Sequence, residues 1–140
     1  MIRYRQIKDS DLDLIEELWR ELEDYHLSIN PDAVDVPFYI RLDALKKKEF
    51  AVFTAWSQNR LIGFCIAASD NDSSGIIEAI YVKGHFRYKG IGSALFKKSL
   101  AWFKKKKIKR IHIGVVYGNT SVFPFYEKFG FRPQAYILRN

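Results

Sequence analysis

A strand pattern followed directly by a helix pattern and a second strand pattern, between residues 76 and 117, restricts the fold of this chain more than any other feature. Ile76 to Val82 is an apolar, β-branched run, and apolar residues then recur at helical spacing from Gly90 to Phe103. Ile111 to Tyr117 has strand character again. Two strands joined through a helix lie parallel in one sheet. The pattern therefore predicts an α/β chain with at least one parallel strand pair.

Local patterns predict the other elements. In chain order we expect a strand at Ile2 to Ile7, a helix capped by Asp9-Ser10-Asp11, a second helix with Pro37 at its first position, an antiparallel hairpin of Phe50 to Trp56 with Leu61 to Ala68, a short helix at Val122 to Phe129 closed by Gly130, and a last strand at Phe131 to Leu138. No linker or repeat divides this order, so we expect a single domain, residues 1–140.

Composition narrows the class of protein further. The chain has 48% apolar residues, 8 Gly and 4 Pro, which is too apolar for disorder and too poor in Gly and Pro for a fibrous repeat. Its one cysteine, Cys65, allows no intramolecular disulfide and no CxxC zinc site. The charged first residues are not a secretory signal, and no run of 18 apolar residues is present. We expect a cytoplasmic protein that does not span a membrane.

The charges are separated along the chain. Eight acidic residues fall between Asp9 and Asp24, whereas Lys83 to Arg110 contains eleven Lys or Arg and no acid, within a net charge of +7. A basic half favours an anionic ligand, which could be a phosphate-bearing cofactor, nucleic acid or an acidic membrane surface. The run Lys104 to Lys107 fits equally the solvated, dipole-complementing end of a helix.

The loop between the strand at 76–82 and the following helix has the composition of an anion site. It reads Arg87-Tyr88-Lys89-Gly90-Ile91-Gly92-Ser93. Two glycines let the backbone turn tightly and approach a ligand, and the free amides at a helix start favour a pyrophosphate. Leu95 stands where a dinucleotide GxGxxG has its third glycine, and no Gly-Lys-Ser/Thr ending follows. A merely flexible turn is the alternative.

Three segments together resemble the GNAT N-acetyltransferase superfamily. Arg87 to Gly92 is similar to its RxxGxG acyl-coenzyme A loop, Ile77 to Val82 to its fourth strand, and Asn119 with 125–131 (Phe-Tyr-Glu-Lys-Phe-Gly-Phe) to its "N…FYEKxGF" segment. Lys83-Gly84-His85 departs from the proline that many members have. The resemblance implies the acyl-CoA N-acyltransferase fold, α/β of the α+β type. Its sheet would be mixed and mostly antiparallel, with six to seven strands and about four flanking helices.

The resemblance also implies site residues for acetyl-CoA. Those for cofactor binding are Ile80, Val82, Arg87, Lys89, Gly90, Ile91, Gly92, Ser93, Asn119 and Tyr126. Ile80 and Val82 would pair with the pantetheine arm as an added strand does, and the Val82 amide would stabilise the oxyanion. Lys97, Lys98 and Lys128 are candidates, unranked, for contacts with coenzyme A phosphates.

Tyr126 and Glu78 are the candidate catalytic residues. After Asp72 the only carboxylates are Glu78, Glu127 and the C-terminus, and an amine must lose a proton before it attacks a thioester. Glu78 would act as the base through water, bind the acceptor's ammonium, or form only a salt bridge. Tyr126 resembles the family's acid for the departing thiolate, although the surrounding aromatics could be core packing alone.

We therefore expect an N-acetyltransferase that moves an acetyl group from acetyl-CoA to a primary amine by direct attack in a ternary complex. The acceptor stays open: small amine or polyamine, amino acid, or peptide or protein amine. It would enter from the side made by the first two helices with their connection, Tyr25 to Leu45, and by the C-terminal strand. Asp24, Asp32, Asp35 and Asp43 could attract a cationic acceptor or be solvated loop charges.

Other outcomes stay open. The alternatives are a basic nucleic-acid-binding module and a non-catalytic acyl-CoA-binding sensor. We expect no metal, because His26, His85 and His112 lack ligand spacing. Cys65 fits a buried side chain better than a nucleophile. The aromatic C-terminal strand could form a homodimer edge.

Overall fold

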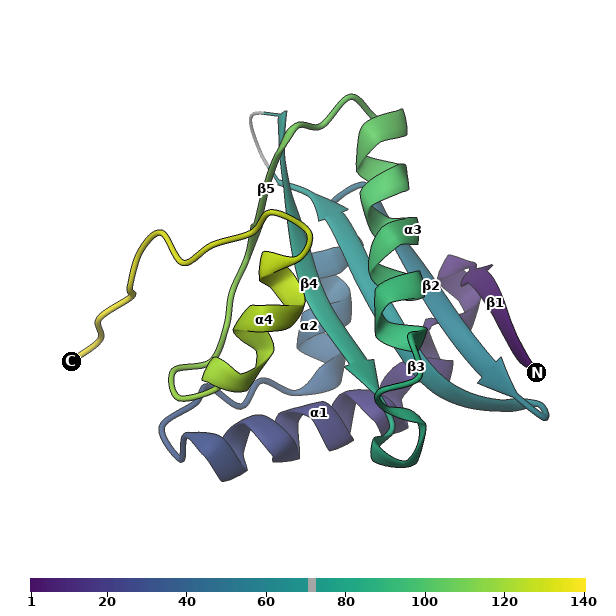
Figure 1. The fold of residues 1–140 in the computed structure, drawn as a ribbon, viewed down its shortest axis with the longest axis horizontal. Coiled ribbons are helices and arrows are strands. Elements are labelled where there is room, and N and C mark those ends of the chain that lie inside the picture. The colour runs from purple at the N-terminus through teal and green to yellow at the C-terminus, as the bar shows by residue number, and fades with distance from the viewer. Residues whose placement is uncertain (71–72) are drawn as a thin grey trace.

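A sheet with the strand order β1-β2-β3-β4-β5 forms the centre of the computed structural model, which describes residues 1–70 and 73–140 (Figure 1). The strands are β1 (Ile2–Ile7), β2 (Phe50–Ser57), β3 (Arg60–Ser69), β4 (Ser74–Val82) and β5 (Arg110–Ile113). The first three pairings are antiparallel, and β4 pairs with β5 in parallel. The predicted hairpin and the predicted parallel crossover are thereby confirmed.

Helices cover both faces of this sheet (Figure 1). They are α1 (Glu16–Ile29), α2 (Phe38–Leu45), α3 (Ile91–Lys105) and α4 (Phe123–Glu127), with short 3-10 helices at Asp9–Ile15, Gly84–Phe86 and Thr120–Val122. One apolar core lies between the sheet and α1, where Leu18, Trp19 and Leu22 are buried. A second lies under α3, where Leu95, Phe96 and Phe103 are buried.

The starts of the first two helices differ from the prediction. The first begins as a 3-10 helix after Lys8, and no side chain caps it; the Asp11 amide donates to the Lys8 carbonyl at 2.9 Å instead. The backbone thus closes this turn without an aspartate side chain. Pro37 is the N-cap of α2 rather than its first helical residue, because its ψ of 142° is extended.

The predicted last strand, Phe131 to Leu138, is wrong, and the predicted strand at 111–117 is too long. Residues 131–140 contain no strand and extend away from the sheet (Figure 1). Tyr136, Ile137 and Leu138 are 83%, 81% and 92% exposed. An extended segment becomes a strand only where a neighbour offers a hydrogen-bonding edge, and β5, the adjacent edge, ends after four residues at Ile113. The described part of the chain therefore has five strands, not six or seven.

Candidate active site between strands β4 and β5

β4 and β5 pair over only half of the length of β4. Their parallel register runs from Ser74 opposite Arg110 to Ile77 opposite Ile113 and stops there. β4 continues to Val82, which pairs with Gly63 of β3 on its other side. From residue 78 to residue 82, β4 thus has no strand partner on the β5 side. Unpaired backbone groups at such an edge can bind a ligand that itself carries amides.

A β-bulge in β4 begins where this pairing ends. Ile77 pairs with Ala67 and Ala79 pairs with Ile66, so Glu78 is an extra residue on β4. A bulge bends its strand and increases the local twist. The bulge thus lies at the point where β5 ends at Ile113 and β4 continues without it.

The bulge also positions the Glu78 side chain. Its Oε1 accepts a hydrogen bond from Lys48 Nζ at 3.1 Å, and the carboxylate is 21% exposed. Lys48 follows α2, so Glu78 faces the α1 and α2 side of the sheet. The salt bridge that sequence analysis left open is present, and water can still reach the carboxylate.

The loop before α3 turns tightly at Gly90 and leaves backbone amides free at the helix start. Gly90 is the N-cap of α3 and has a φ of +80°, which an L side chain rarely adopts. The first helical hydrogen bond runs from the Ala94 amide to the Gly90 carbonyl at 3.0 Å. The amides of Ile91, Gly92 and Ser93 therefore have no acceptor within the helix, and they lie at its positive end.

Both glycines leave room beside these amides. A Cβ on Gly90 would have no neighbour within 4 Å, and a Cβ on Gly92 would make only ordinary contacts, the nearest with Phe125 at 3.5 Å. Packing within the protein therefore does not require glycine at residue 92. Close approach of a ligand is a physical reason for glycine at this position. We call the free amides of residues 91–93, with the open space beside Gly90 and Gly92, the anion cradle; its size and donors fit a pyrophosphate.

Lys128 brings positive charge to the same place. Its Nζ donates to Ser93 Oγ at 2.7 Å and lies 4.8 Å from the centre of the Phe125 ring. Of the three unranked lysines, Lys128 is thus the one in contact with the first turn of α3. Lys98 lies over Tyr4 of β1 instead, at 5.3 Å, at the opposite edge of the sheet.

The Arg87 side chain is directed away from the start of α3. Its Nε donates to the Val82 carbonyl at 2.8 Å, and its guanidinium carbon lies 5.2 Å from the Tyr81 ring centre and 5.5 Å from that of Tyr25. Lys89 Nζ lies 5.9 Å from the Phe86 ring centre. The contacts of Arg87 with α1 were missed, since no pattern in the sequence links residue 25 to the loop.

Tyr126 lies in α4, on the other side of the sheet from Glu78. Its ring centre is 5.7 Å from that of Phe96, and burial raises the pKa of its hydroxyl above the usual value. The phenol is therefore protonated at neutral pH, the form that a proton donor needs. The structure does not bring Tyr126 and Glu78 into contact.

Asn119 and Cys65 are both buried polar groups. Asn119 is 6% exposed, and its Oδ1 accepts a hydrogen bond from Ser121 Oγ at 3.4 Å. Cys65 is fully buried under α3, where Ser99 Oγ donates to its sulfur at 3.1 Å. Burial raises the pKa of the Cys65 thiol to about 12, so it is not a thiolate at neutral pH.

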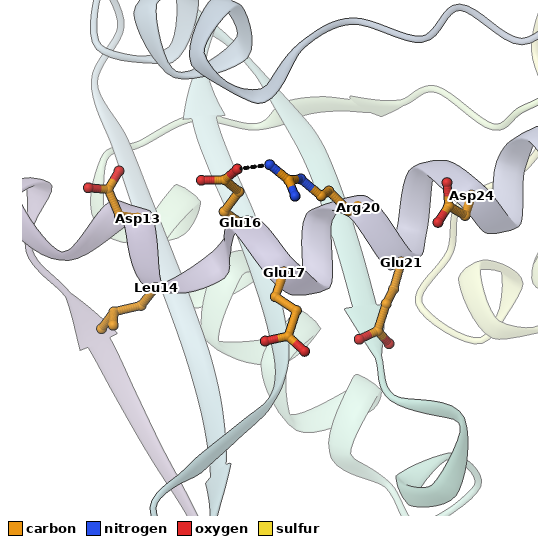
Figure 2. A pocket seen from close by; sticks show the side chains of 7 residues that line it. All are labelled: Asp13, Leu14, Glu16, Glu17, Arg20, Glu21 and Asp24. Atoms are coloured by element: carbon orange, nitrogen blue, oxygen red, sulfur yellow. Dashed lines mark hydrogen bonds and ion pairs between the residues drawn. The ribbon is translucent and has the colours of Figure 1, made fainter.

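The outer surface of α1 carries a hollow that is strongly acidic (Figure 2). Its lining residues are Asp13, Leu14, Glu16, Glu17, Arg20, Glu21 and Asp24. Arg20, the one cation among them, is paired with Glu16. Glu17 and Glu21, one turn apart, point to the same side of the helix (Figure 2).

Outside residues 71–72, no three His, Cys, Asp or Glu side chains are grouped as metal ligands would be. Over the same residues, no helix has the length and apolarity needed to cross a bilayer.

Fold and site together define a class: an α/β protein with a parallel strand pair that opens beside a helix start with free backbone amides. The sequence profile of the acetyltransferase (GNAT) family matches residues 12–131, and the chain belongs to this family. The family and fold predicted from the three segments are thereby confirmed, apart from the number of strands.

A relative found by sequence is consistent with this family assignment. An uncharacterized N-acetyltransferase of Methanocaldococcus jannaschii is 28% identical over an alignment of 100 residues, and the match covers 66% of this chain and 44% of that protein. The chain thus spans less than half the length of this relative.

Solved structures share the fold at low sequence identity. PaiA N-acetyltransferase from Thermoplasma acidophilum, in complex with coenzyme A, superposes with a TM-score of 0.73 at 22% identity, over 96% of this chain and 91% of that one. AAC(6')-Iy, in complex with a bisubstrate analogue, has a TM-score of 0.71 at 19% identity, over 100% and 97%.

Proposed function

We propose that this protein is an acetyl-CoA-dependent N-acetyltransferase that transfers the acetyl group directly to a primary amine in a ternary complex. The observation that carries the proposal is the unpartnered half of β4 beside the free amides of α3, in a chain of the GNAT family. The complexes of similar folds with coenzyme A and with a bisubstrate analogue support it.

The same geometry supports the binding role of the loop. The amides of Ile91, Gly92 and Ser93 would donate to the pyrophosphate, with Lys128 adding positive charge. The backbone of Ile80 and Val82 would pair with the pantetheine amides, and Asn119 would hold the same arm. Arg87, Lys89 and Gly90 would shape the turn; Lys89 and Gly90 would contribute backbone amides, whereas the Arg87 amide already donates to the Gly84 carbonyl at 3.3 Å.

Direct transfer from an ammonium needs three proton movements. The nitrogen loses one proton before it attacks the thioester carbonyl carbon and a second when the tetrahedral intermediate collapses; the C–S bond then breaks, the sulfur takes up one proton, and one proton is released to water overall. Glu78 would accept the protons of the nitrogen through water, and Tyr126 would donate the proton to the sulfur. The 21% exposure of the Glu78 side chain to water and the protonated state of the Tyr126 hydroxyl support these roles. The buried thiol of Cys65 argues against a covalent acetyl-enzyme.

The acceptor would be a cationic amine. The acidic outer surface of α1 would attract a positively charged molecule towards the side of the sheet on which Glu78 lies. A polyamine, an amino acid and a peptide or protein amine all carry such a group. A cytoplasmic location and a homodimer stay predictions.

The test combines acetyl-CoA titration with a screen of amines, in which released coenzyme A is detected as free thiol. Tyr126→Phe should lower kcat at least about tenfold with little change in acetyl-CoA affinity. Tyr136→Phe, at an exposed tyrosine outside the site, is the matched control and should leave both unchanged.

Other results would overturn parts of the proposal. Unchanged kcat in Tyr126→Phe would remove its acid role. Acetyl-CoA binding without turnover on any amine would leave a non-catalytic sensor. Nucleic acid binding without acetyl-CoA binding would favour the basic module.

A further inference from the structure

We propose that Glu21 of α1 is a positioning residue that holds the end of β4, and through it the phosphate loop, in the binding geometry. This inference rests on the proposed binding of acetyl-CoA. Glu21 Oε1 accepts a hydrogen bond from the Tyr81 hydroxyl at 3.1 Å, and its Oε2 accepts one from Lys83 Nζ at 2.9 Å. One carboxylate thus binds two residues of the β4 end from another layer.

Tyr81 connects this carboxylate to the loop. The Arg87 guanidinium lies against the Tyr81 ring at 5.2 Å and against Tyr25, the residue one turn after Glu21, at 5.5 Å. Arg87 Nε also donates to the Val82 carbonyl at 2.8 Å. The first residue of the loop is therefore clamped between α1 and the last residue of β4.

These contacts are partly shielded from water. The side chains of Glu21 and Lys83 are 32% and 23% exposed, and burial, followed by the hydrogen bond to Glu21, raises the pKa of the Tyr81 hydroxyl. Tyr81 thus stays a hydrogen-bond donor at neutral pH. A charge-assisted bond in such a place is stronger than one at a fully exposed surface.

Helix α1 also reaches the far side of the opened strands. A Cβ placed on Gly118, in the segment between β5 and α4, would lie 3.1 Å from Ile29 Cγ2 at the end of α1. The same helix therefore contacts the end of β4 and the segment that follows β5. A helix held at both sides fixes the width of the opening between them.

Electrostatics and positioning predict opposite effects of removing this carboxylate. Glu21 is a negative charge close to a proposed anion site, so its loss should strengthen coenzyme A binding if charge alone matters. If Glu21 instead holds Tyr81, Lys83 and Arg87 in place, its loss should weaken binding. The sign of the change separates the two.

The experiment measures the dissociation constant of acetyl-CoA by calorimetry for the whole chain and its variants. Glu21→Ala should raise it about fivefold, and Tyr81→Phe about threefold, because Tyr81→Phe breaks only one of the two hydrogen bonds of the carboxylate and because both residues act on the ligand only through the loop. In a double-mutant cycle, Tyr81→Phe should add little on top of Glu21→Ala, because both changes break the same contact. In turnover, KM for acetyl-CoA should rise while kcat changes by less than about twofold.

Glu17→Gln is the matched control for charge. Glu17 lies one turn before Glu21 on the same side of α1 (Figure 2), and among the described residues it has no ion pair or side-chain hydrogen bond. Its acetyl-CoA dissociation constant should be unchanged or slightly lower. Thermal unfolding of each variant shows whether a change in binding merely follows a loss of stability.

Three results would overturn the inference. The first is a dissociation constant in Glu21→Ala that is equal to or lower than that of the parent, as in Glu17→Gln. The second is a Glu21→Ala variant that loses thermal stability while its acetyl-CoA binding is unchanged, which would show that Glu21 has only a structural role. The third is a parent protein that does not bind acetyl-CoA, and this result alone also removes the proposed function.

Discussion

Replacement of Gly90 by alanine tests the anion cradle with a single methyl group. Gly90 has a φ of +80°, and a Cβ there would meet no protein atom within 4 Å, so backbone conformation is the source of the cost within the protein. That cost is about 1–2 kcal/mol for an L residue in the left-handed region. With about 2 cal/mol/K of unfolding entropy per residue, it lowers Tm by about 3–7 °C in a chain of this length.

Two responses of the loop lead to the same result for ligand binding. If the loop keeps its conformation, the methyl group occupies the space beside the free amides. If it relaxes to a negative φ, binding must restore the strained form, at a loss of about 5- to 30-fold in affinity for the same 1–2 kcal/mol. Either way, the dissociation constant of acetyl-CoA rises.

Gly130→Ala is the matched control. Gly130 has a φ of +88° and an equally open Cβ position, but it closes α4 rather than starting α3. Both variants should lose similar stability in thermal unfolding, and only Gly90→Ala should lose affinity in calorimetry. Parent-like affinity in Gly90→Ala would refute the assignment of the cradle to residue 90.

Two further predictions concern the core under α3. Gly75→Ala should lower the free energy of unfolding by at least about 2 kcal/mol in urea denaturation, because its Cβ would lie 2.4 Å from Phe103 Cε1; parent-like stability would show that this ring can move aside. Cys65 should resist iodoacetamide in the native protein at pH 8 and react only after unfolding, since burial raises its pKa to about 12; rapid alkylation with loss of turnover would contradict this account.

The fold was predictable where periodicity and turn residues agree. The hairpin of β2 and β3 is one such place: Gln58 and Asn59 form its turn, with φ of 48° and 65°, the pair of left-handed residues that matches the twist of two strands. The crossover through α3 is another, because the glycines and the helical pattern lie next to each other in the sequence.

The last strand was not predictable from Phe131 to Leu138 alone. Its aromatic and β-branched residues have strand character, but pairing depends on β5, and that strand ends at Ile113. Local propensity says nothing of whether a neighbouring edge is available.

The site was predictable only in its backbone part. Gly90 and Gly92 mark the cradle because their spacing and place are local features. Glu21 and Tyr25 were missed because they lie about 60 residues before the loop and reach it only through tertiary packing. Glu78 was a candidate because few carboxylates follow Asp72, but nothing in the apolar sequence around it indicates a bulge.

Deletion of Glu78, the extra residue of β4, would remove the bulge. Ile76 and Ala79 pack in the α1 core, whereas Ile77 and Ile80 pack in the α3 core, so only residue 78 interrupts the two-residue alternation. A chain lacking this one amino acid would keep every other β4 side chain in its present layer. Without the bulge, β4 would run straight and could pair with the β5 side over more residues, which would close the opening between the two strands. One residue in β4 thus decides whether the sheet is closed at this edge or has an opening that can bind a ligand.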